Sequence, residues 1–326
     1  MKKIIKRIAV ALMALLAVAT FVGCGGNPSS PSGPDIPDPG PAKEEKVLDV
    51  ILLAGQSNAL GLSNWSDTAV YYDNVLFFGF YGEGSTMTNR DQSDIDGCIA
   101  ECRWTKVQNG LGQTQGRFGP EIGIAGVCED RHTNTDHDIA IVKCAWGGMS
   151  INSFFLSPTS VKKAVGDVSS AKTYSDDEDT IKCGKGYWTM IKTFRAAEKK
   201  ALEGKYTKVN YIGMCWMQGE ADACNSTAAF KYHLLLSNLM NDLRTYLSVP
   251  DLPFAIGEIK PPESAAYSAT VIEKQKYVCN NDPNAMFVPS NDLTMKPDDI
   301  WHYDTESMKT LGTRFGTAIF DLIENA

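Results

Sequence analysis

The stretch VLDVILLAGQSN, from Val47 to Asn58, decides the fold. An uninterrupted apolar run of this length is typical of a fully buried strand in a parallel sheet. Small residues then let the chain turn at the carboxyl end of the strand, the edge where ligands bind in open α/β sheets. Ser57 therefore lies where a nucleophile would be useful. The alternative is a strand followed by a polar turn, and Ala59 removes the second glycine of a Gly-x-Ser-x-Gly elbow.

The rest of the chain alternates between predicted strands and helices. This alternation predicts an α/β fold, with a mostly parallel sheet covered by helices on both faces. The predicted strands are 47–53, 75–80, 138–146, 209–217, 253–259 and 285–289. The predicted helices are 118–127, 187–202, one from about 226, 266–278 and one after Asp304, which is its expected N-cap.

The first 44 residues differ from the rest in composition. Residues 1–23 have a basic start and an apolar run too short for a membrane span, which predicts an export signal. The sequence before Cys24 resembles a bacterial lipobox, although Phe21 replaces the usual leucine, so we expect lipidation at Cys24. Residues 24–44 are rich in Gly, Pro and Ser and predict a flexible tether to one domain over 45–326. We therefore expect a lipid-anchored lipoprotein of the bacterial cell envelope, at the outer membrane or surface; the alternative is a secreted or periplasmic protein.

The net charge argues against nucleic acid as a partner. Removal of the signal leaves 27 basic residues against 39 acidic ones, a net charge of −12. Membrane contact is expected only through the lipid anchor.

Eight cysteines remain after Cys24, and two kinds can be separated. Cys144 and Cys215 lie in predicted strands and are expected to be buried thiols. The other six are open to disulfide pairing in an oxidising compartment, with no connectivity readable from sequence: Cys98, Cys102, Cys128, Cys183, Cys224 and Cys279. The spacing of Cys98 and Cys102 lacks the further ligands of a metal site, so neither a metal nor another cofactor is expected.

Two further segments stand at predicted strand ends. Gly147-Gly148-Met149-Ser150 allows close approach of a backbone N–H to a ligand, and 218–222 (QGEAD) gathers two carboxylates and an amide. Each also has an ordinary interpretation, as a glycine turn and as a helix cap. Residues 81–116 are polar and irregular, which predicts a functional or lid-like insertion.

Ester hydrolysis by a serine needs a base, a group that orients the base and donors for the oxyanion. The chain has four histidines. His132 and His137 lie in a polar stretch typical of a surface, and His233 falls within a predicted helix. His302 lies in a predicted loop three residues after Asp299, so elimination favours it as the base.

Five motifs together resemble the SGNH hydrolase superfamily, and within it the branch of sialate O-acetylesterase-like proteins and carbohydrate esterase family 6 acetylxylan esterases. They are GQSN at 55–58, FGPE at 118–121, GGMSI at 147–151, WMQGEAD at 216–222 and DIWH at 299–302. The resemblance implies a flavodoxin-like three-layer α/β/α sandwich and a metal-free carbohydrate esterase. It assigns Ser57 as nucleophile, His302 as base and Asp299 as the orienting acid, with an oxyanion hole from the N–H groups of Ser57 and Gly148.

The sequence departs from the superfamily at one position. Ala221 replaces an asparagine that serves as a third oxyanion donor, so Gln218 becomes the candidate donor. Glu220 is the rival of Asp299 as acid partner or a brace behind it. Gln56 and Asp222 are further candidates for such supporting roles, and Arg117 and Glu121 are candidate substrate contacts.

The expected function is removal of O-acetyl groups from a polysaccharide such as acetylated xylan, with O-acetylated sialic acid as the alternative. A different class, a carbohydrate-binding surface lipoprotein that has lost catalysis, is disfavoured by the retained Ser57, Asp299 and His302. A metal-dependent deacetylase would require a ligand cluster that the sequence does not show.

Overall fold

The computed structural model describes residues 45–65, 70–79 and 95–326. The predicted signal peptide, the lipidation site and the tether lie outside these ranges, as does the first part of the 81–116 insertion. Within the described ranges, no helix is long and apolar enough to cross a bilayer.

A seven-stranded sheet in the order β11-β10-β9-β1-β6-β3-β4 forms the centre of the molecule. All neighbouring strands run parallel except β3 and β4, which are antiparallel. The strands are β1 (Val47–Gly55), β3 (Tyr71–Gly79), β4 (Arg103–Gln108), β6 (His137–Ala145), β9 (Lys208–Met217), β10 (Phe254–Gly257) and β11 (Ala285–Val288). Every residue of β1 is buried, as its apolar run predicts, and β1 lies between β6 and β9.

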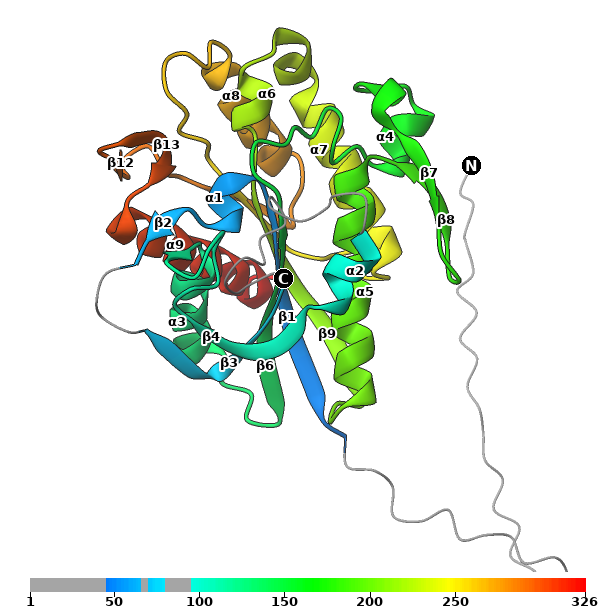
Figure 1. Cartoon of the computed structure of the whole chain (residues 1–326), viewed down its shortest axis with the longest axis vertical. Coiled ribbons are helices and arrows are strands. Elements are labelled where there is room, and N and C mark those ends of the chain that lie inside the picture. The colour runs from blue at the N-terminus through cyan, green and yellow to red at the C-terminus, as the bar shows by residue number, and fades with distance from the viewer. Residues whose placement is uncertain (1–44, 66–69, 80–94) are drawn as a thin grey trace, which may run out of the picture. The chain divides into compact units, whose positions relative to one another are not determined.

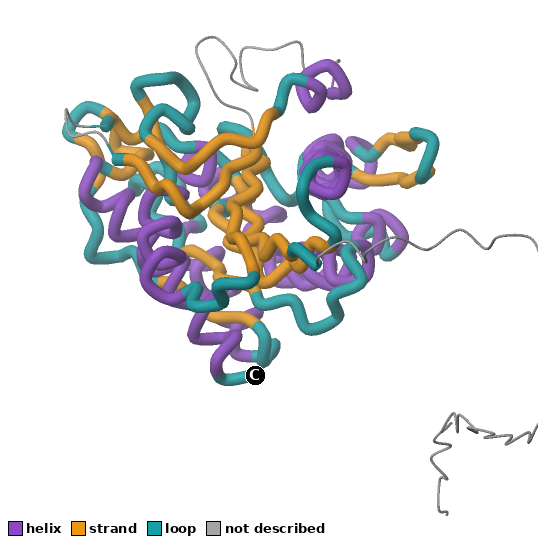
Figure 2. Tube along the Cα trace, turned by 90° about the horizontal axis from the view of Figure 1, so that it is seen from below, coloured by secondary structure: helices purple, strands orange, loops and turns teal. Residues whose placement is uncertain are grey.

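Helices cover both faces of the sheet (Figures 1 and 2). The layer of α3 (Glu121–Arg131) and α9 (Thr305–Glu324) lies on one face. On the other face, α5 (Lys185–Glu203) packs against β1, β6 and β9, and α7 (Ser226–Tyr246) packs with α8 (Ser268–Asn280). The predicted three-layer α/β/α architecture is therefore confirmed, and Asp304 caps α9 by accepting from Ser307 N.

The strand order adds a detail to this architecture. In a flavodoxin-like sheet the first strand lies directly beside the second parallel strand along the chain. Here β6 lies between β1 and β3. The carboxyl ends of β6, β1 and β9 are consequently adjacent, which brings together three of the segments that the sequence singled out.

Two glycines set the distance between α3 and α9. A Cβ on Gly123 would lie 2.1 Å from Lys309 O, and a Cβ on Gly312 would lie 2.1 Å from Pro120 O. Both contacts are with backbone, which cannot rotate away as a side chain can. The two helices therefore pack at backbone contact.

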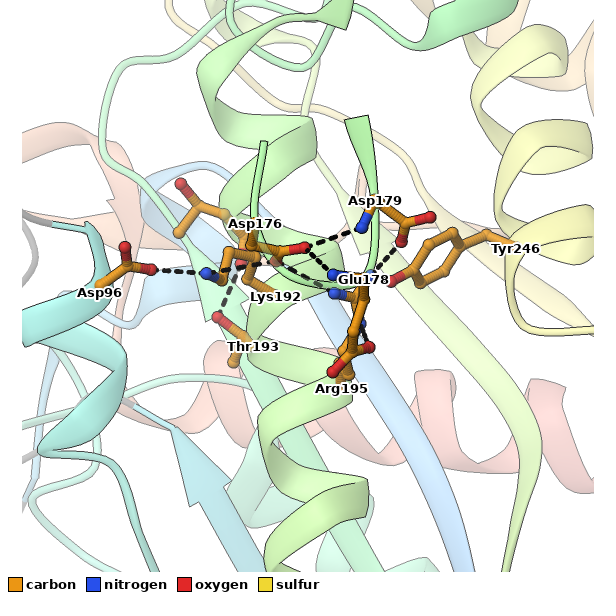
Figure 3. A network of polar contacts seen from close by, with 9 residues as sticks. Asp96, Asp176, Glu178, Asp179, Lys192, Thr193, Arg195 and Tyr246 are labelled. Carbon is orange, nitrogen blue, oxygen red and sulfur yellow. Dashed lines mark hydrogen bonds and ion pairs between the residues drawn. The ribbon is translucent and has the colours of Figure 1, made fainter. Parts of the chain in front are cut away.

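The structure corrects the prediction that 81–116 is irregular. Its described part contains α2 (Ile95–Ala100) and β4, and β4 extends the main sheet at one edge. Lys192 of α5 forms an ion pair with Asp96 of α2 at 2.6 Å, which attaches α2 to the helical layer that contains α5 (Figure 3).

A second set of ion pairs attaches the hairpin of β7 (Lys172–Ser175) and β8 (Thr180–Cys183) to α5. This hairpin follows α4 (Pro158–Lys162) and the short 3-10 helix η1 (Val168–Ser170) in the chain. Asp176 and Asp179 at its tip pair with Arg195 of α5, which also contacts the Tyr246 hydroxyl (Figure 3). The hairpin is therefore fixed to α5 through charge.

Cys144 in β6 and Cys215 in β9 are buried free thiols, as predicted. Burial raises the pKa of the Cys144 thiol to about 12, although hydrogen bonds with Thr193 and Trp146 oppose the shift. A thiol with this pKa is protonated at neutral pH and packs as a small apolar side chain.

Candidate active site

The turn after β1 places Ser57 at the centre of the carboxyl edge. Gly55 has φ +140°, and a Cβ there would lie 1.9 Å from Met217 O, so only glycine fits. Gln56 N then donates to Met217 O at 2.8 Å, and α1 (Ser57–Leu60) begins. Because Ser57 is the first residue of this one-turn helix, its N–H has no acceptor within the helix and is available to a ligand.

His302 and Asp299 lie on a small hairpin over this edge. The hairpin joins β12 (Met295–Lys296) to β13 (Asp299–Tyr303), so His302 is on a short strand rather than in the predicted loop. His302 Nδ1 lies 2.6 Å from Asp299 Oδ2, and Trp301 N donates to Asp299 Oδ1 at 3.2 Å. The two residues that the sequence proposed as base and orienting acid are thus in direct contact.

Lys296 is a third member of this cluster. Its Nζ lies 2.9 Å from Asp299 Oδ2, the same oxygen that contacts His302. Burial opposes ionisation of Asp299, but the hydrogen bonds from Lys296 and His302 outweigh it and lower the pKa of Asp299 to about 2. Asp299 is therefore a carboxylate throughout the physiological pH range.

The pKa of His302 is lowered below its usual 6.5. Burial is the largest cause; the bond to Asp299 opposes it, and the positive charges of Lys296 and Arg117 reinforce it. The imidazole is consequently neutral at neutral pH, the state in which it can accept a proton.

Asn58 joins the serine turn to the histidine strand. Its Nδ2 donates to Trp301 O at 3.1 Å and to Glu220 Oε1 at 2.8 Å. Ser63 Oγ makes a second link by donating to Tyr303 O at 2.6 Å. The neighbours of Ser57 are therefore bonded to the neighbours of His302, although the bonded residues are 243 and 240 positions apart in sequence.

The segment after β6 forms another wall of the site. Gly148 is exposed with φ +67°, and a Cβ there would meet nothing within 4 Å, so backbone conformation rather than crowding favours glycine. Asp222 holds the next residues by accepting from Ser150 Oγ at 2.6 Å, Ile151 N at 3.0 Å and Asn152 N at 3.2 Å. It also lies on α6 (Glu220–Ala223), directly after β9.

Gln218 is fully buried and makes several internal hydrogen bonds. Its Nε2 lies 2.6 Å from Asp222 Oδ2, 3.0 Å from Met149 O and 3.2 Å from Gln56 Oε1. Gln56 Oε1 in turn accepts from Ala221 N at 3.2 Å. These contacts connect the ends of β1, β6 and β9 and give Gln56, Gln218 and Asp222 the character of a brace.

Glu121 is not a substrate contact, contrary to the prediction. It is completely buried, and its Oε2 pairs with Lys143 Nζ at 2.9 Å while Oε1 accepts from Gly119 N at 2.8 Å. Lys143 also donates to Leu60 O at 3.0 Å and Leu111 O at 2.6 Å. Lys143 of this ion pair therefore binds the last residue of α1, Leu60, through its carbonyl oxygen.

Arg117 lies on the short strand β5 (Arg117–Phe118), which pairs with β2 (Ser63–Asn64). It is partly exposed, and its guanidinium donates to Leu62 O, which also accepts from Lys296. Its positive charge lies close enough to His302 to lower the pKa of the histidine. The sequence placed Arg117 beside the site but gave no sign of Lys296.

The mostly parallel sheet between two helical layers, with Ser57 at its carboxyl edge and the Asp299–His302 pair on a hairpin bonded to the same turn, defines an α/β protein with a candidate hydrolytic site. A profile of the family described as "Carbohydrate esterase, sialic acid-specific acetylesterase" matches residues 47–321. The chain belongs to this family, so its class of activity is that of a carbohydrate acetylesterase. No curated protein matches the chain.

Solved structures show the same fold at low sequence identity. A protein from Arabidopsis thaliana has a TM-score of 0.59 at 20% identity, covering 84% of this chain and 98% of its own. NanS has a TM-score of 0.57 at 16% identity, with coverage of 87% and 99%. A carbohydrate acetylesterase from Xanthomonas citri has a TM-score of 0.54 at 17% identity, with coverage of 85% and 57%.

Proposed function

We propose that the chain is a serine esterase in which Ser57 is the nucleophile, His302 the general base and Asp299 the residue that orients His302. The observation that carries this proposal is the 2.6 Å contact between His302 Nδ1 and Asp299 Oδ2 on a strand tied to the Ser57 turn. Because Asp299 is ionised, it accepts a hydrogen bond from Nδ1–H of His302, which leaves Nε2 unprotonated and free to take the proton of Ser57.

The reaction follows from these roles. Ser57 Oγ attacks the acetyl carbonyl, and His302 takes the hydroxyl proton and returns it to the departing sugar oxygen. Water then attacks the acetyl-serine with His302 again as base, which releases acetate and restores Ser57. The N–H groups of Ser57 and Gly148 stabilise the oxyanion in both steps.

Gln218 has a different role in this proposal from the one that the sequence suggested. An oxyanion donor must direct a free N–H into the site, whereas the Gln218 amide nitrogen contacts three protein acceptors. We assign it, with Gln56 and Asp222, to holding the Gly148 segment in position. The proposed oxyanion hole then consists of backbone N–H groups alone.

For the substrate, we propose acetyl esters of a neutral polysaccharide such as xylan, as in the acetylxylan esterase branch, with O-acetylated sialic acid as the alternative. The family description names sialic acid, which favours the alternative. Recognition of a sialate carboxylate would call for an available cation, for which Arg117 is the candidate, although one of its N–H groups donates to Leu62 O. The net charge of −12 after signal removal also disfavours an anionic sugar, within the limits of screening over about 8 Å.

Acetate release from acetylated xylo-oligosaccharides and from O-acetylated sialic acid, at matched concentration, tests this proposal. We expect a higher kcat/KM on the xylo-oligosaccharide and little selectivity change in Arg117→Ala. A higher value on the sialic acid ester, reduced selectively by Arg117→Ala, would reverse the substrate and leave the esterase mechanism intact.

We also propose that Cys24 carries a lipid that anchors the domain to the cell envelope, where it can meet polymeric substrate. Growth with a radiolabelled fatty acid tests the anchor. The wild-type chain should carry label and Cys24→Ala should not, whereas equal labelling of both would exclude lipidation at this residue.

A further inference from the structure

Two buried oxygens beside the serine turn have no hydrogen-bond partner within the described residues. They are Asn58 Oδ1 and Glu220 Oε2. Both side chains are about 99% buried, each residue being 1% exposed. They belong to one pair, because Asn58 Nδ2 donates to Glu220 Oε1 at 2.8 Å. Two unpaired buried acceptors in one contact are costly, so this arrangement needs a physical explanation.

An ionised Glu220 cannot supply the missing interaction. A carboxylate only accepts hydrogen bonds, and Asn58 Oδ1 also only accepts. A proton on Glu220 Oε2 would turn one of the two unpaired acceptors into a donor for the other. The amide and the acid would then be joined by two antiparallel hydrogen bonds.

The charges around Glu220 favour the protonated form. No cation forms an ion pair with it in the described part of the chain, and Asp222 lies two residues further along α6. The groups facing it from α7 and β13 are the hydroxyls of Tyr232 and Tyr303, bonded to Gln218 O and Ser290 Oγ. Burial raises the pKa of Glu220 to about 7, and Asp222 adds to the shift while the Asn58 bond opposes it.

We propose that Glu220 acts as a neutral carboxylic acid that donates from Oε2 to Asn58 Oδ1 and accepts from Asn58 Nδ2 at Oε1. In this form it is a positioning residue. It fixes the plane of the Asn58 amide, whose other Nδ2 hydrogen reaches Trp301 O beside His302. The effect on turnover rests on the proposed esterase mechanism, but the protonation state does not.

Asp222, on the same short helix, provides an internal contrast. Its oxygens accept from Ser150 Oγ, Ile151 N, Asn152 N and Gln218 Nε2. Three of these partners are N–H groups that can only donate, and they reach both oxygens, so Asp222 has to remain an acceptor even though burial raises its pKa as well. An amide should therefore replace Glu220 well and Asp222 poorly.

Infrared difference spectroscopy on the full chain tests the protonation state directly. At about pH 5.5, above the ordinary glutamate pKa of about 4.3, the wild-type minus Glu220→Gln spectrum should contain a protonated-carboxyl C=O band that shifts in deuterium oxide. Asp299→Asn is the control and should give only carboxylate bands, because the pKa of Asp299 is about 2. A Glu220→Gln difference with only carboxylate bands would overturn the proposal.

The pH dependence of Tm gives a second readout. Because the folded pKa of Glu220 lies above its ordinary value of 4.5, its contribution to stability is present below that value and is lost as pH rises through about 7. Glu220→Gln removes the titrating group, so its Tm should fall less than that of wild type over this range. Parallel curves for the two proteins would contradict a neutral Glu220.

Activity completes the test. Glu220→Ala leaves the Asn58 amide without its partner, and we expect a kcat loss on the order of 10²-fold from misplacement of the site. Glu220→Gln should restore most of that loss, whereas Asp222→Asn should lower Tm. Failure of Ser57 as nucleophile would leave the infrared and Tm results unchanged, so the two proposals can fail separately; a Glu220→Gln variant as slow as Glu220→Ala would refute the positioning role.

Discussion

Two aspartate–histidine clusters lie near opposite edges of the main sheet, one on the β12–β13 hairpin over its carboxyl edge, and their hydrogen bonds are similar in length. At the carboxyl edge, His302 Nδ1 lies 2.6 Å from Asp299 Oδ2. Toward the amino end, Asp49 of β1 lies 2.9 Å from both His132 Nε2 and His137 Nδ1. The polar sequence around His132 and His137 suggested two surface residues. Instead, both side chains contact Asp49.

The difference lies in what surrounds each pair. Asp49 is shared by two imidazoles and by Asn210 Nδ2 at 2.9 Å, so its oxygens join β1, β6, β9 and the end of α3. Asp299 is shared with one imidazole and one lysine, next to the one-turn helix that begins at Ser57. An aspartate–histidine contact is therefore no sign of catalysis by itself. In the proposed active site, the hydroxyl and backbone N–H of the Ser57 turn are what distinguish one pair from the other.

Removal of the proposed nucleophile should cause the largest loss of turnover. Ser57→Ala deletes a hydroxyl that makes no hydrogen bond to a described side chain, so the fold should remain while turnover falls by about 10⁴-fold or more. Steady-state kinetics on an acetyl ester and a thermal melt measure the two quantities. Near-normal kcat with an unchanged Tm would exclude the covalent route.

The next largest effect should come from the acid partner. Asp299→Asn cannot fix the Nδ1–H tautomer of His302, and comparable changes in serine triads cost about 10⁴-fold in kcat. Glu220→Gln should cost much less, because Glu220 bonds Asn58 and not His302. The reverse ranking would make Glu220 the partner of the base.

Lys296 should contribute to the position of the acid limb of the pH–rate profile. Burial lowers the pKa of His302 and the charge of Lys296 lowers it further, so wild-type activity should fall only below about pH 6.5. Lys296→Met removes that charge and raises the pKa of His302, which should move the midpoint of the acid limb upward and cost up to about tenfold in activity at low pH.

Lys309→Met provides a control of equal charge, because Lys309 pairs with Glu306 on α9 at the surface. It should leave the midpoint where it is in wild type. An equal shift in both variants would attribute the effect to net charge, and no shift in Lys296→Met would remove Lys296 from the proposal.

The smallest effect on turnover should come from the amino-end cluster. Burial opposes ionisation of Asp49, but hydrogen bonds from His132, Asn210 and His137 prevail and lower its pKa. Its contribution to stability is therefore present above the unfolded pKa and lost as pH falls through the folded pKa. Asp49→Asn should destabilise the neutral-pH protein by about 1–3 kcal/mol with kcat unchanged. A large kcat loss without a change in stability would mean that this end also serves catalysis.

The fold was readable from sequence where burial imposes a strong pattern. The apolar runs of β1, β6 and β9 predicted a parallel sheet because strands buried on both faces have few polar positions. The edge strand β4 was missed because its sequence, RWTKVQ, alternates polar and apolar residues weakly within a polar segment. The β12–β13 hairpin was missed because its pairing is very short, so His302 was expected in a loop.

The site was readable only in part for a related reason. Chemically distinctive residues at strand ends, such as Ser57 and His302, can be singled out from sequence. The residues that hold them in position cannot, because those roles depend on contacts between distant parts of the chain. Lys143 did carry a signal, since a lysine within a buried strand needs a partner, and that partner is Glu121. Lys296 carried none, because an isolated lysine in a polar turn is ordinary.

The backbone contact between α3 and α9 has a consequence for how this protein can be changed. Position 312 lies ten residues after His302, and α9 continues directly from the strand that carries that histidine. Even alanine at Gly312 or Gly123 would require the two backbones to separate. In a saturation library screened for activity, these two helix positions should therefore be as depleted as the reacting residues, and recombination with homologues should succeed only when both helices come from the same parent.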